Sequence, residues 1–218
     1  MEWSLYKDLE LAFLLASWIL FVTVALTKWL YKPLSRFGHN RAVYFNRKII
    51  HVLGGGVAAV AVPHFSNWVV PTAAAILLAI ILYIPRRAGR LMWWFQMPDN
   101  AYEVSFAVMW GVVVALSWGV LGDWRPGVLA ALFMAVGDSA TGVVRNFVFG
   151  RRIKHWIGNL AMAAVCIPIG WAYLGLIGAL AGVLASVVER FEYPPIDDNV
   201  IVPLTTFLFL AIYKFYPL

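Results

Sequence analysis

Long apolar stretches separated by short polar ones make up almost the whole chain. Apolar runs of near-spanning length occur at 9–27, 49–65, 67–85, 103–121, 126–149, 158–174, 176–191 and 199–216. Because roughly 20 apolar residues in a helix cross the hydrocarbon core of a bilayer, the pattern predicts an all-α, polytopic membrane helix bundle. We expect about eight transmembrane helices, or seven, because 49–65 and 176–191 are marginal in length. No repeat or linker interrupts the pattern, which predicts a single integral membrane domain over 1–218.

The composition agrees with a membrane protein. Of 218 residues, 62% are hydrophobic and 13% are charged, whereas about a quarter of the residues of a soluble domain are charged. The 11 tryptophans and 9 tyrosines suit the interfacial belts of a bilayer protein. The single cysteine, Cys166, excludes an intramolecular disulfide. The first apolar run lacks a basic leader and a small-residue cleavage site, so we expect it to be a retained span.

Lysine and arginine are distributed unevenly between alternate loops. With eight spans, fourteen of the 17 fall on one side, and only Lys7, Arg125 and Lys214 fall on the other. The positive-inside rule makes the basic side cytoplasmic and places both termini outside. The net charge of +6 then reflects orientation and anionic lipid or phosphate ligands, and we expect no nucleic-acid partner. The compact chain favours a prokaryotic cell membrane over an organelle, with the functional site facing the cytoplasm.

One carboxylate, Asp138, lies inside an apolar run. Asp138, Thr141, Gly142 and Arg145 share one face of a helix. An acidic group at this depth is costly, so it should face the bundle interior or a wet cavity and mark a functional site. Asp138 and Arg145 are two turns apart, too far for a direct intrahelical pair. The alternative is a buried aspartate that a neighbouring helix satisfies.

A basic loop follows this helix. Its cations are Arg145, Arg151, Arg152, Lys154 and, when protonated, His155. Arginine forks and a lysine ammonium suit phosphate oxygens. Membrane topology alone would explain these charges but not Asp138.

A second basic group precedes the second span. Lys48 and Arg47 lie three and four residues before His51, so the three side chains should be neighbours on a helix. The group either holds an anionic phosphate with His51 as a second donor, or forms a snorkelling flank beside an ordinary interface histidine. The glycines at 54–56 allow another backbone to approach closely.

Acidic residues gather before the last span, at Glu189, Glu192, Asp197 and Asp198, followed by Asn199. Carboxylate oxygens suit Mg²⁺, whose octahedron substrate phosphates can complete. The alternative is that Asp198 or Asn199 only caps the last helix. Glu103 opens the fourth span, where it complements the helix dipole or serves a catalytic or metal site. The basic and tryptophan-containing loop before Glu103 predicts an amphipathic segment on the inner leaflet.

Together, the predicted cytoplasmic face offers cations for phosphates, carboxylates for a metal, and an apolar bundle for a lipid. This combination indicates phosphate chemistry on a membrane-embedded substrate, without separating phosphoryl from nucleotidyl transfer. The chain has no P-loop, no G-x-G-x-x-G fingerprint and no H-E-x-x-H motif. It also lacks the D-G-x-x-A-R run of CDP-alcohol phosphotransferases and the aspartate-rich pair of intramembrane prenyltransferases.

Three motifs, in this order, resemble the membrane polyprenol kinase family, which includes dolichol kinase, phytol kinase and related prokaryotic proteins. R-K-x-x-H-V at 47–52 is similar to the early motif, and Gly137-Asp138 with its basic loop resembles G-D-[AST]-x-A. D-N-V-I-V-P-L at 198–204 resembles the late D-N-x-x-[IV]-P-L. The likeness covers most of 47–204. One loop departs from the pattern K-[ST]-x-E-G-[ST], because Ile157 stands where the family has glutamate.

The resemblance implies a CTP-dependent, Mg²⁺-dependent kinase of an isoprenoid alcohol such as geranylgeraniol, phytol or a dolichol-type polyprenol. It implies nucleotide and Mg²⁺ binding around Asp138 and the basic loop that follows. Within this hypothesis, Asp138 and one of Asp197 or Asp198 would hold the metal, and Asp138, Lys48 and His51 are the candidate catalytic residues, the last as the base. The candidate nucleotide-binding residues are Arg145, Arg151, Arg152, Lys154, Gly158 and Asn159. Arg47, Glu103 and Asn199 are candidates for substrate binding or for a structural role.

Two other functions use similar residues. A CTP-dependent phospholipid cytidylyltransferase needs nearly the same apparatus but releases pyrophosphate and forms a CDP-lipid. A lipid or phosphate transporter is a third alternative, although the charged motifs crowd one face and leave the other nearly bare.

Overall fold

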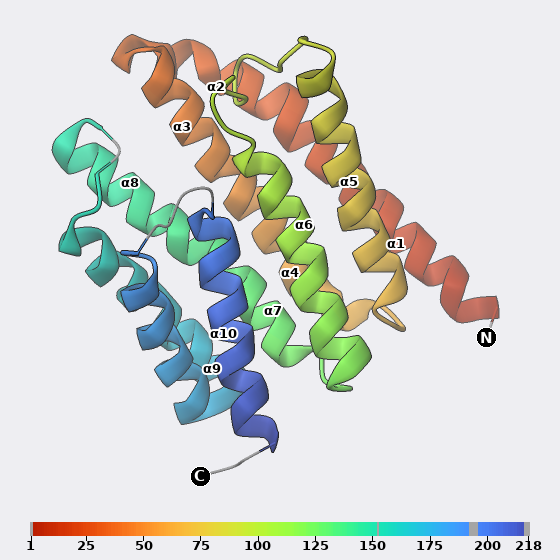
Figure 1. The fold of residues 1–218 in the computed structure, drawn as a ribbon. Coiled ribbons are helices and arrows are strands. Elements are labelled where there is room, and N and C mark those ends of the chain that lie inside the picture. Colours follow the sequence, from red (N-terminus) through yellow and green to blue (C-terminus); the bar gives the residue numbers. More distant parts are fainter. Residues whose placement is uncertain (1, 152, 192–195, 216–218) are drawn as a thin grey trace.

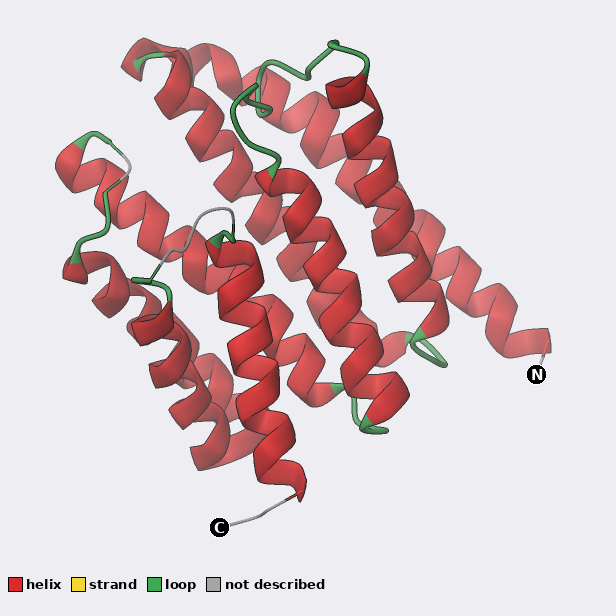
Figure 2. Cartoon of the chain, in the orientation of Figure 1, coloured by secondary structure: helices red, strands yellow, loops and turns green. Residues whose placement is uncertain are grey.

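The protein is a bundle of helices, and no described residue forms a strand (Figures 1 and 2). The structure, a computed structural model, describes residues 2–151, 153–191 and 196–215. In chain order the helical elements are α1 (Glu2–Leu20), η1 (Phe21–Leu26), α2 (Thr27–Leu34), η2 (Ser35–Phe37), α3 (His39–Ile50), η3 (His51–Gly56), α4 (Val57–Ala61), η4 (Val62–His64), α5 (Val69–Arg87), α6 (Tyr102–Val114), η5 (Ala115–Val120), α7 (Arg125–Leu132), η6 (Phe133–Gly137), α8 (Asp138–Phe149), α9 (Trp156–Val188) and α10 (Asp198–Phe215).

Six helical segments of the described chain are long and apolar enough to cross a membrane. They are Ser4–Phe37, Val69–Arg87, Tyr102–Val120, Arg125–Phe149, Trp156–Val188 and Asp198–Phe215. Apolar side chains on the outer helices are exposed, as lipid contact requires, including Leu77 and Ile80 on α5. The predicted membrane helix bundle is thus confirmed, while the number of spans and the side of the termini stay predictions.

The helix α9 is divided into two arms that form a hairpin. Leu174 and Gly175 have non-helical backbone angles, and Gly175 has φ +59°, a conformation that favours glycine. The two arms pack against each other without side chains between them, because a Cβ on Gly182 would collide with the backbone of Cys166. The arms correspond to the separate apolar runs expected at 158–174 and 176–191. The fold-back brings both ends of α9 to the same end of the bundle.

The centre of the bundle is α7 and η6. Every residue from Pro126 to Ala135 is buried, and α6, α9 and α10 pack around this segment. Small side chains such as Ala130 and Ala131 let the neighbouring helices approach closely. Asp138 follows directly at the start of α8, so it emerges from the most enclosed part of the protein.

Two π-helical turns, η3 and η6, pack against each other at this point. A Cβ on Gly55 would collide with the ring of Phe106, and one on Gly56 would press on Val136. Side chains, and not another backbone, therefore fill the space beside Gly55 and Gly56. Such turns interrupt the regular helical ladder and are frequent at functional sites. Here η3 begins at His51, and η6 ends one residue before Asp138.

The loop before α6 differs from the sequence prediction. It forms no amphipathic helix on a surface, because Trp94 and Phe95 are buried in the bundle. The Trp94 indole donates a 2.8 Å hydrogen bond to the carbonyl of Thr23, and Gln96 donates a 2.9 Å bond to that of Leu82. Tertiary packing of these side chains fixes the loop to α5 and η1.

Candidate functional site

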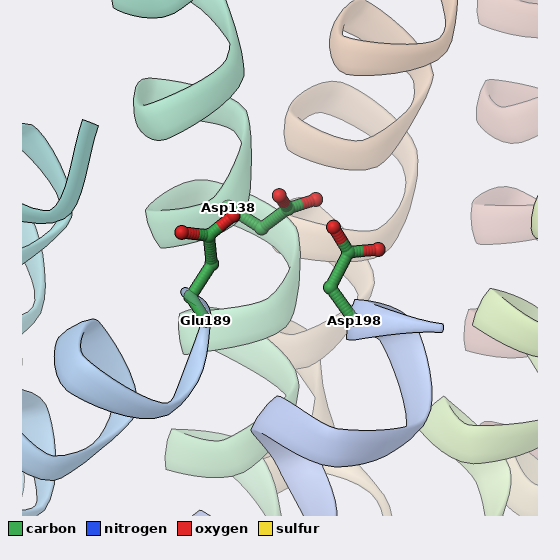
Figure 3. A group of neighbouring side chains, drawn as sticks. All are labelled: Asp138, Glu189 and Asp198. Atoms are coloured by element: carbon green, nitrogen blue, oxygen red, sulfur yellow. The ribbon is translucent and has the colours of Figure 1, made fainter. Parts of the chain in front are cut away.

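Three carboxylates from distant parts of the chain meet in the bundle. Asp138 opens α8, Glu189 directly follows α9, and Asp198 opens α10 (Figure 3). One oxygen from each lies within 4.8 Å of the others. The α9 hairpin explains why Glu189 reaches α8, since both ends of α9 lie together. Like charges this close require cations or a metal between them.

Three buried or half-buried cations are interleaved with these carboxylates. The Lys48 ammonium lies 2.5 Å from Asp138 Oδ2, and Arg145 Nη1 lies 2.7 Å from Glu189 Oε1. Lys154 contacts two carboxylates, at 2.8 Å from Glu189 and 3.2 Å from Asp198. Three cations therefore face three anions, and this arrangement allows the charges to remain buried.

Lys154 stands in the loop between α8 and α9, at the mouth of this cluster. Burial opposes its charged form, but the carboxylates of Asp198 and Glu189 outweigh burial and raise the pKa of Lys154 above its usual 10.5. The loop turns back because Gly150 ends α8 with φ +68°. Lys154 is thus a permanent positive charge that the loop holds over the carboxylates.

Arg145 is fixed by the first turn of α9. Its Nε donates to the carbonyl of His155 at 2.9 Å, and its Nη2 donates to Asn159 Oδ1 at 3.0 Å. Gly158 lies under the guanidinium, where a side chain would collide with it. Asn159 also donates to Glu189 Oε2 at 3.3 Å. Gly158 and Asn159, expected at the nucleotide, here hold the arginine in place.

A small pocket opens between these groups. Its lining residues are Tyr44, Asp138, Thr141, Gly142, Arg145, Ile153, Lys154, Glu189 and Asp198. The four positions predicted to share a helix face, Asp138 to Arg145, all line it. Its volume of about 20 Å³ suffices for one water or a bare ion. A triphosphate is larger than this volume.

The carboxylates fit a divalent cation. Oxygens bound to one Mg²⁺ at 2.0–2.1 Å lie at most about 4.2 Å apart. The oxygens of Asp138, Glu189 and Asp198 span up to 4.8 Å, a difference that small side-chain rotations close. An all-oxygen ligand set is the one that Mg²⁺ prefers.

His51 lies beside Asp138. Its Nδ1 is 4.0 Å from Asp138 Oδ2, beyond hydrogen-bond distance, and its ring stacks on Phe106 at 4.0 Å. Nδ1 is buried and has no hydrogen-bond partner among the described residues. A buried polar atom in this state is unusual and marks a position for a ligand or a proton.

Two expected residues, Arg47 and Glu103, belong to a different network. Arg47 Nη2 lies 3.3 Å from Glu103 and its Nε donates to the carbonyl of Phe95 at 2.7 Å. Arg86 and Gln96 complete the carboxylate's contacts at 2.9 and 3.0 Å. The helix thus separates neighbours in sequence, with Lys48 on the Asp138 side and Arg47 on the α6 side.

Asp197 and Asn199 connect α10 to α6 and do not reach the other carboxylates. Ser105 donates a 2.6 Å hydrogen bond to Asp197, and Asn199 donates at 3.1 Å to the carbonyl of Tyr102. Burial raises the pKa of Asp197 above its usual value, and the Ser105 bond offsets this only partly. Of the expected pair at 197 and 198, only Asp198 joins the cluster.

Two further expected residues, Arg151 and Arg152, belong to the basic loop. Arg151 is exposed at the start of the loop, and Arg152 lies outside the described residues. Tyr44, a pocket residue, is not among the sequence candidates, whereas Glu189 is one of the hinge carboxylates considered as Mg²⁺ ligands. The sequence signal for Glu189 was its place among those acidic residues, whereas no pattern pointed to Tyr44.

The comparisons with known proteins give one distant relative. No protein-family model matches the chain, and no solved structure matches it. Probable phytol kinase 2, chloroplastic, of Glycine max is 27% identical over 189 residues. The alignment covers 75% of this chain and 63% of the relative, so the chain spans less than two thirds of the relative's length. The chain is therefore similar, at a distance, to a protein named as a phytol kinase, which agrees with its resemblance to membrane polyprenol kinases.

Proposed function

We propose that this protein is a membrane kinase that transfers the γ-phosphoryl group of CTP to an isoprenoid alcohol. The observation that carries the proposal is the convergence of three carboxylates and three cations at one pocket inside an apolar bundle. The similarity to a protein named as a phytol kinase supports the choice of an isoprenoid alcohol as acceptor. Geranylgeraniol, phytol and dolichol-type polyprenols are the acceptors in this class.

Asp138, Glu189 and Asp198 would hold Mg²⁺, which neutralises phosphate charge and keeps the triphosphate in line with the acceptor. Lys48 pairs with Asp138 and Lys154 with Glu189 in the structure. On binding, the ammonium of Lys154 turns to the phosphates, and Arg145 presents its fork from a fixed position. Phosphoryl transfer depends on such positioning and charge neutralisation more than on covalent chemistry by the protein.

The acceptor hydroxyl would lie between Lys48 and His51, next to Asp138. Its oxygen forms a bond to the γ-phosphorus while the bond from that phosphorus to the bridging oxygen breaks, and CDP leaves with the electron pair. The proton passes to Nδ1 of His51, the buried atom without a described partner. Lys48 stabilises the oxygen as negative charge develops on it.

Glu189 also offers an answer to the departure at Ile157. The related kinases have a glutamate three residues after the lysine that aligns with Lys154, and this chain has isoleucine. Glu189 places a carboxylate 2.8 Å from the same lysine, from the other end of α9. We infer that Glu189 supplies the carboxylate that position 157 lacks.

The test is a phosphorylation assay on purified protein in detergent, with Mg²⁺, geranylgeraniol and each of the four ribonucleoside triphosphates in turn. CTP should support formation of the lipid phosphate, and Asp138→Asn should lower the rate by about a hundredfold or more, since it removes charge at the reacting phosphate. Asp123→Asn, which changes a carboxylate paired with Arg125 away from the site, is the matched control. Equal activity of the two variants would contradict the proposal, as would no lipid phosphate with any nucleotide.

A further inference from the structure

A long apolar groove runs along the seam between two helices on the outside of the bundle. Its volume is about 820 Å³, within the roughly 300–1,000 Å³ of small-molecule sites. One wall comes from the segment α2 to η3 and the other from η6 and α8. The lining residues are Leu34, Phe37, Arg41, Phe45, Lys48, Ile49, Val52, Leu53, Val136, Ser139, Ala140, Val143 and Phe147.

The groove and the charged pocket lie on opposite sides of the same helix contact. α3 and α8 run antiparallel, since Lys48 bonds Asp138 near the start of α8 and Arg41 bonds Asn146 near its end. Between these points Gly142 is so close to Tyr44 that a side chain there would collide with it. The wall between groove and pocket is therefore only one layer of side chains thick.

Lys48 passes through this wall. Its side chain lines the groove, and its ammonium lies 2.5 Å from Asp138, which lines the pocket. Ser139, the next residue after Asp138, also lines the groove, and its hydroxyl donates a 2.6 Å hydrogen bond to the carbonyl of Ala135. Apolar residues flank these two positions, with Leu53 and Val136 on one side and Val143 and Phe147 on the other. Arg41 also lines the groove, and its guanidinium donates to Asn146.

Burial of the polar positions disfavours a bulky charged headgroup. Lys48 and Ser139 are both buried, so a hydroxyl loses little hydration beside them, whereas a phospholipid headgroup would have to leave water for a groove lined mainly by apolar residues. At its outer rim the groove is open, because Val143 and Phe147 are exposed. A chain longer than the groove can therefore leave it sideways into the bilayer.

We propose that this groove binds the hydrocarbon chain of the isoprenoid alcohol and delivers its hydroxyl to Lys48. The assignment rests on the proposed kinase function for the identity of the occupant. Chain selectivity then arises in the groove, and phosphate chemistry arises in the pocket. A substitution that fills the groove affects long acceptors while sparing the reacting end.

The kinetic test is Val143→Trp, which fills the groove from its exposed rim. Val183→Trp is the matched control, because Val183 on α9 is 43% exposed, Val143 is 41% exposed, and Val183 does not line the groove. We expect Val143→Trp to raise KM for geranylgeraniol about tenfold, while KM for CTP and turnover of prenol, the shortest isoprenoid alcohol, stay unchanged. Val143→Phe serves as a second variant should tryptophan impair folding. Indistinguishable geranylgeraniol kinetics in the groove variants and the control would overturn the assignment.

A binding test separates this proposal from the kinase function. A geranylgeraniol analogue with a photoreactive diazirine is cross-linked to the wild-type protein in detergent, without nucleotide, and the labelled peptides are identified. Label should concentrate on α3 and α8 and be displaced by geranylgeraniol but not by phosphatidylcholine. Label spread evenly over the outer helices α1 and α5, with no displacement, would refute the groove. Specific labelling without any kinase activity would sustain the groove and remove the proposed function.

Discussion

Removing one partner of the buried ion pair between Arg145 and Glu189 should destabilise the protein far more than removing both. The two groups are 2.7 Å apart, with side chains only 5% and 1% exposed. At an effective dielectric constant of 20 their attraction is about 6 kcal/mol, and the cost of burying the two charges offsets most of it. Loss of one partner leaves the other charge buried and unpaired, which costs about 3–5 kcal/mol.

We therefore expect Arg145→Met and Glu189→Leu each to lower the free energy of unfolding by about 3–5 kcal/mol. Glu189→Leu should be the more severe, since Glu189 also accepts from Lys154 and Asn159. The double variant should recover most of the loss, because Lys154 keeps Asp198 and the cluster again has equal numbers of cations and anions. The coupling energy should be at least about 3 kcal/mol.

The assay is a reversible denaturant titration in detergent micelles, followed by tryptophan fluorescence and repeated for the four proteins of the cycle. The exposed pair Asp123–Arg125 is the control cycle, where Arg125 is 50% exposed and the coupling should stay below about 1 kcal/mol. A double variant as unstable as the sum of its two single variants would refute the charge-balance reasoning.

Three further predictions follow from individual contacts. Gly182→Leu should lower the free energy of unfolding by about 1–3 kcal/mol or more, measured by the same titration, because a side chain there meets the backbone of Cys166; an unchanged midpoint would contradict the close-packed α9 hairpin. Asp198→Asn should raise the Mg²⁺ concentration for half-maximal activity about tenfold or more, whereas Asp197→Asn should leave it unchanged. A larger effect of Asp197→Asn than of Asp198→Asn would contradict the assignment of Asp198 as the metal ligand. Because burial raises the pKa of Asp197 above 3.8, its ionisation disfavours the folded state, so stability should fall as pH rises above that value. Thermal unfolding between about pH 4 and 7 should show a smaller fall for Asp197→Asn, and an identical profile would be evidence against the shift.

Helical pattern and the cost of a buried charge predicted much of this protein from sequence. The apolar runs predicted the membrane bundle, and a carboxylate inside one of them singled out Asp138. The spacing of Asp138 and Arg145 excluded a direct pair, and in the structure each has a partner elsewhere in the chain, Lys48 on α3 and Glu189 directly after α9. Periodicity along one helix thus identified the face of the site.

The remaining parts of the site depend on contacts between helices, and the periodicity within one helix does not predict which residues of other helices it contacts. Arg47 and Lys48 are adjacent in sequence, yet their side chains point to different carboxylates. Asp197 and Asp198 separate in the same way, since only one of two neighbours at a helix start can face the pocket. Glu189 reaches the pocket because α9 folds back at Gly175.

The central claim is tested most directly by following both ends of the nucleotide. Purified protein receives Mg²⁺, geranylgeraniol and CTP labelled at either the α- or the γ-phosphate, beside the Asp138→Asn variant and a parallel reaction with a phospholipid acceptor. The account predicts that the γ label appears in the isoprenoid lipid, that the α label stays in CDP, and that the variant loses the transfer. Transfer of the α label to lipid, with release of pyrophosphate that carries the γ label, would instead identify a cytidylyltransferase. A lipid fraction that contains neither label would contradict the account.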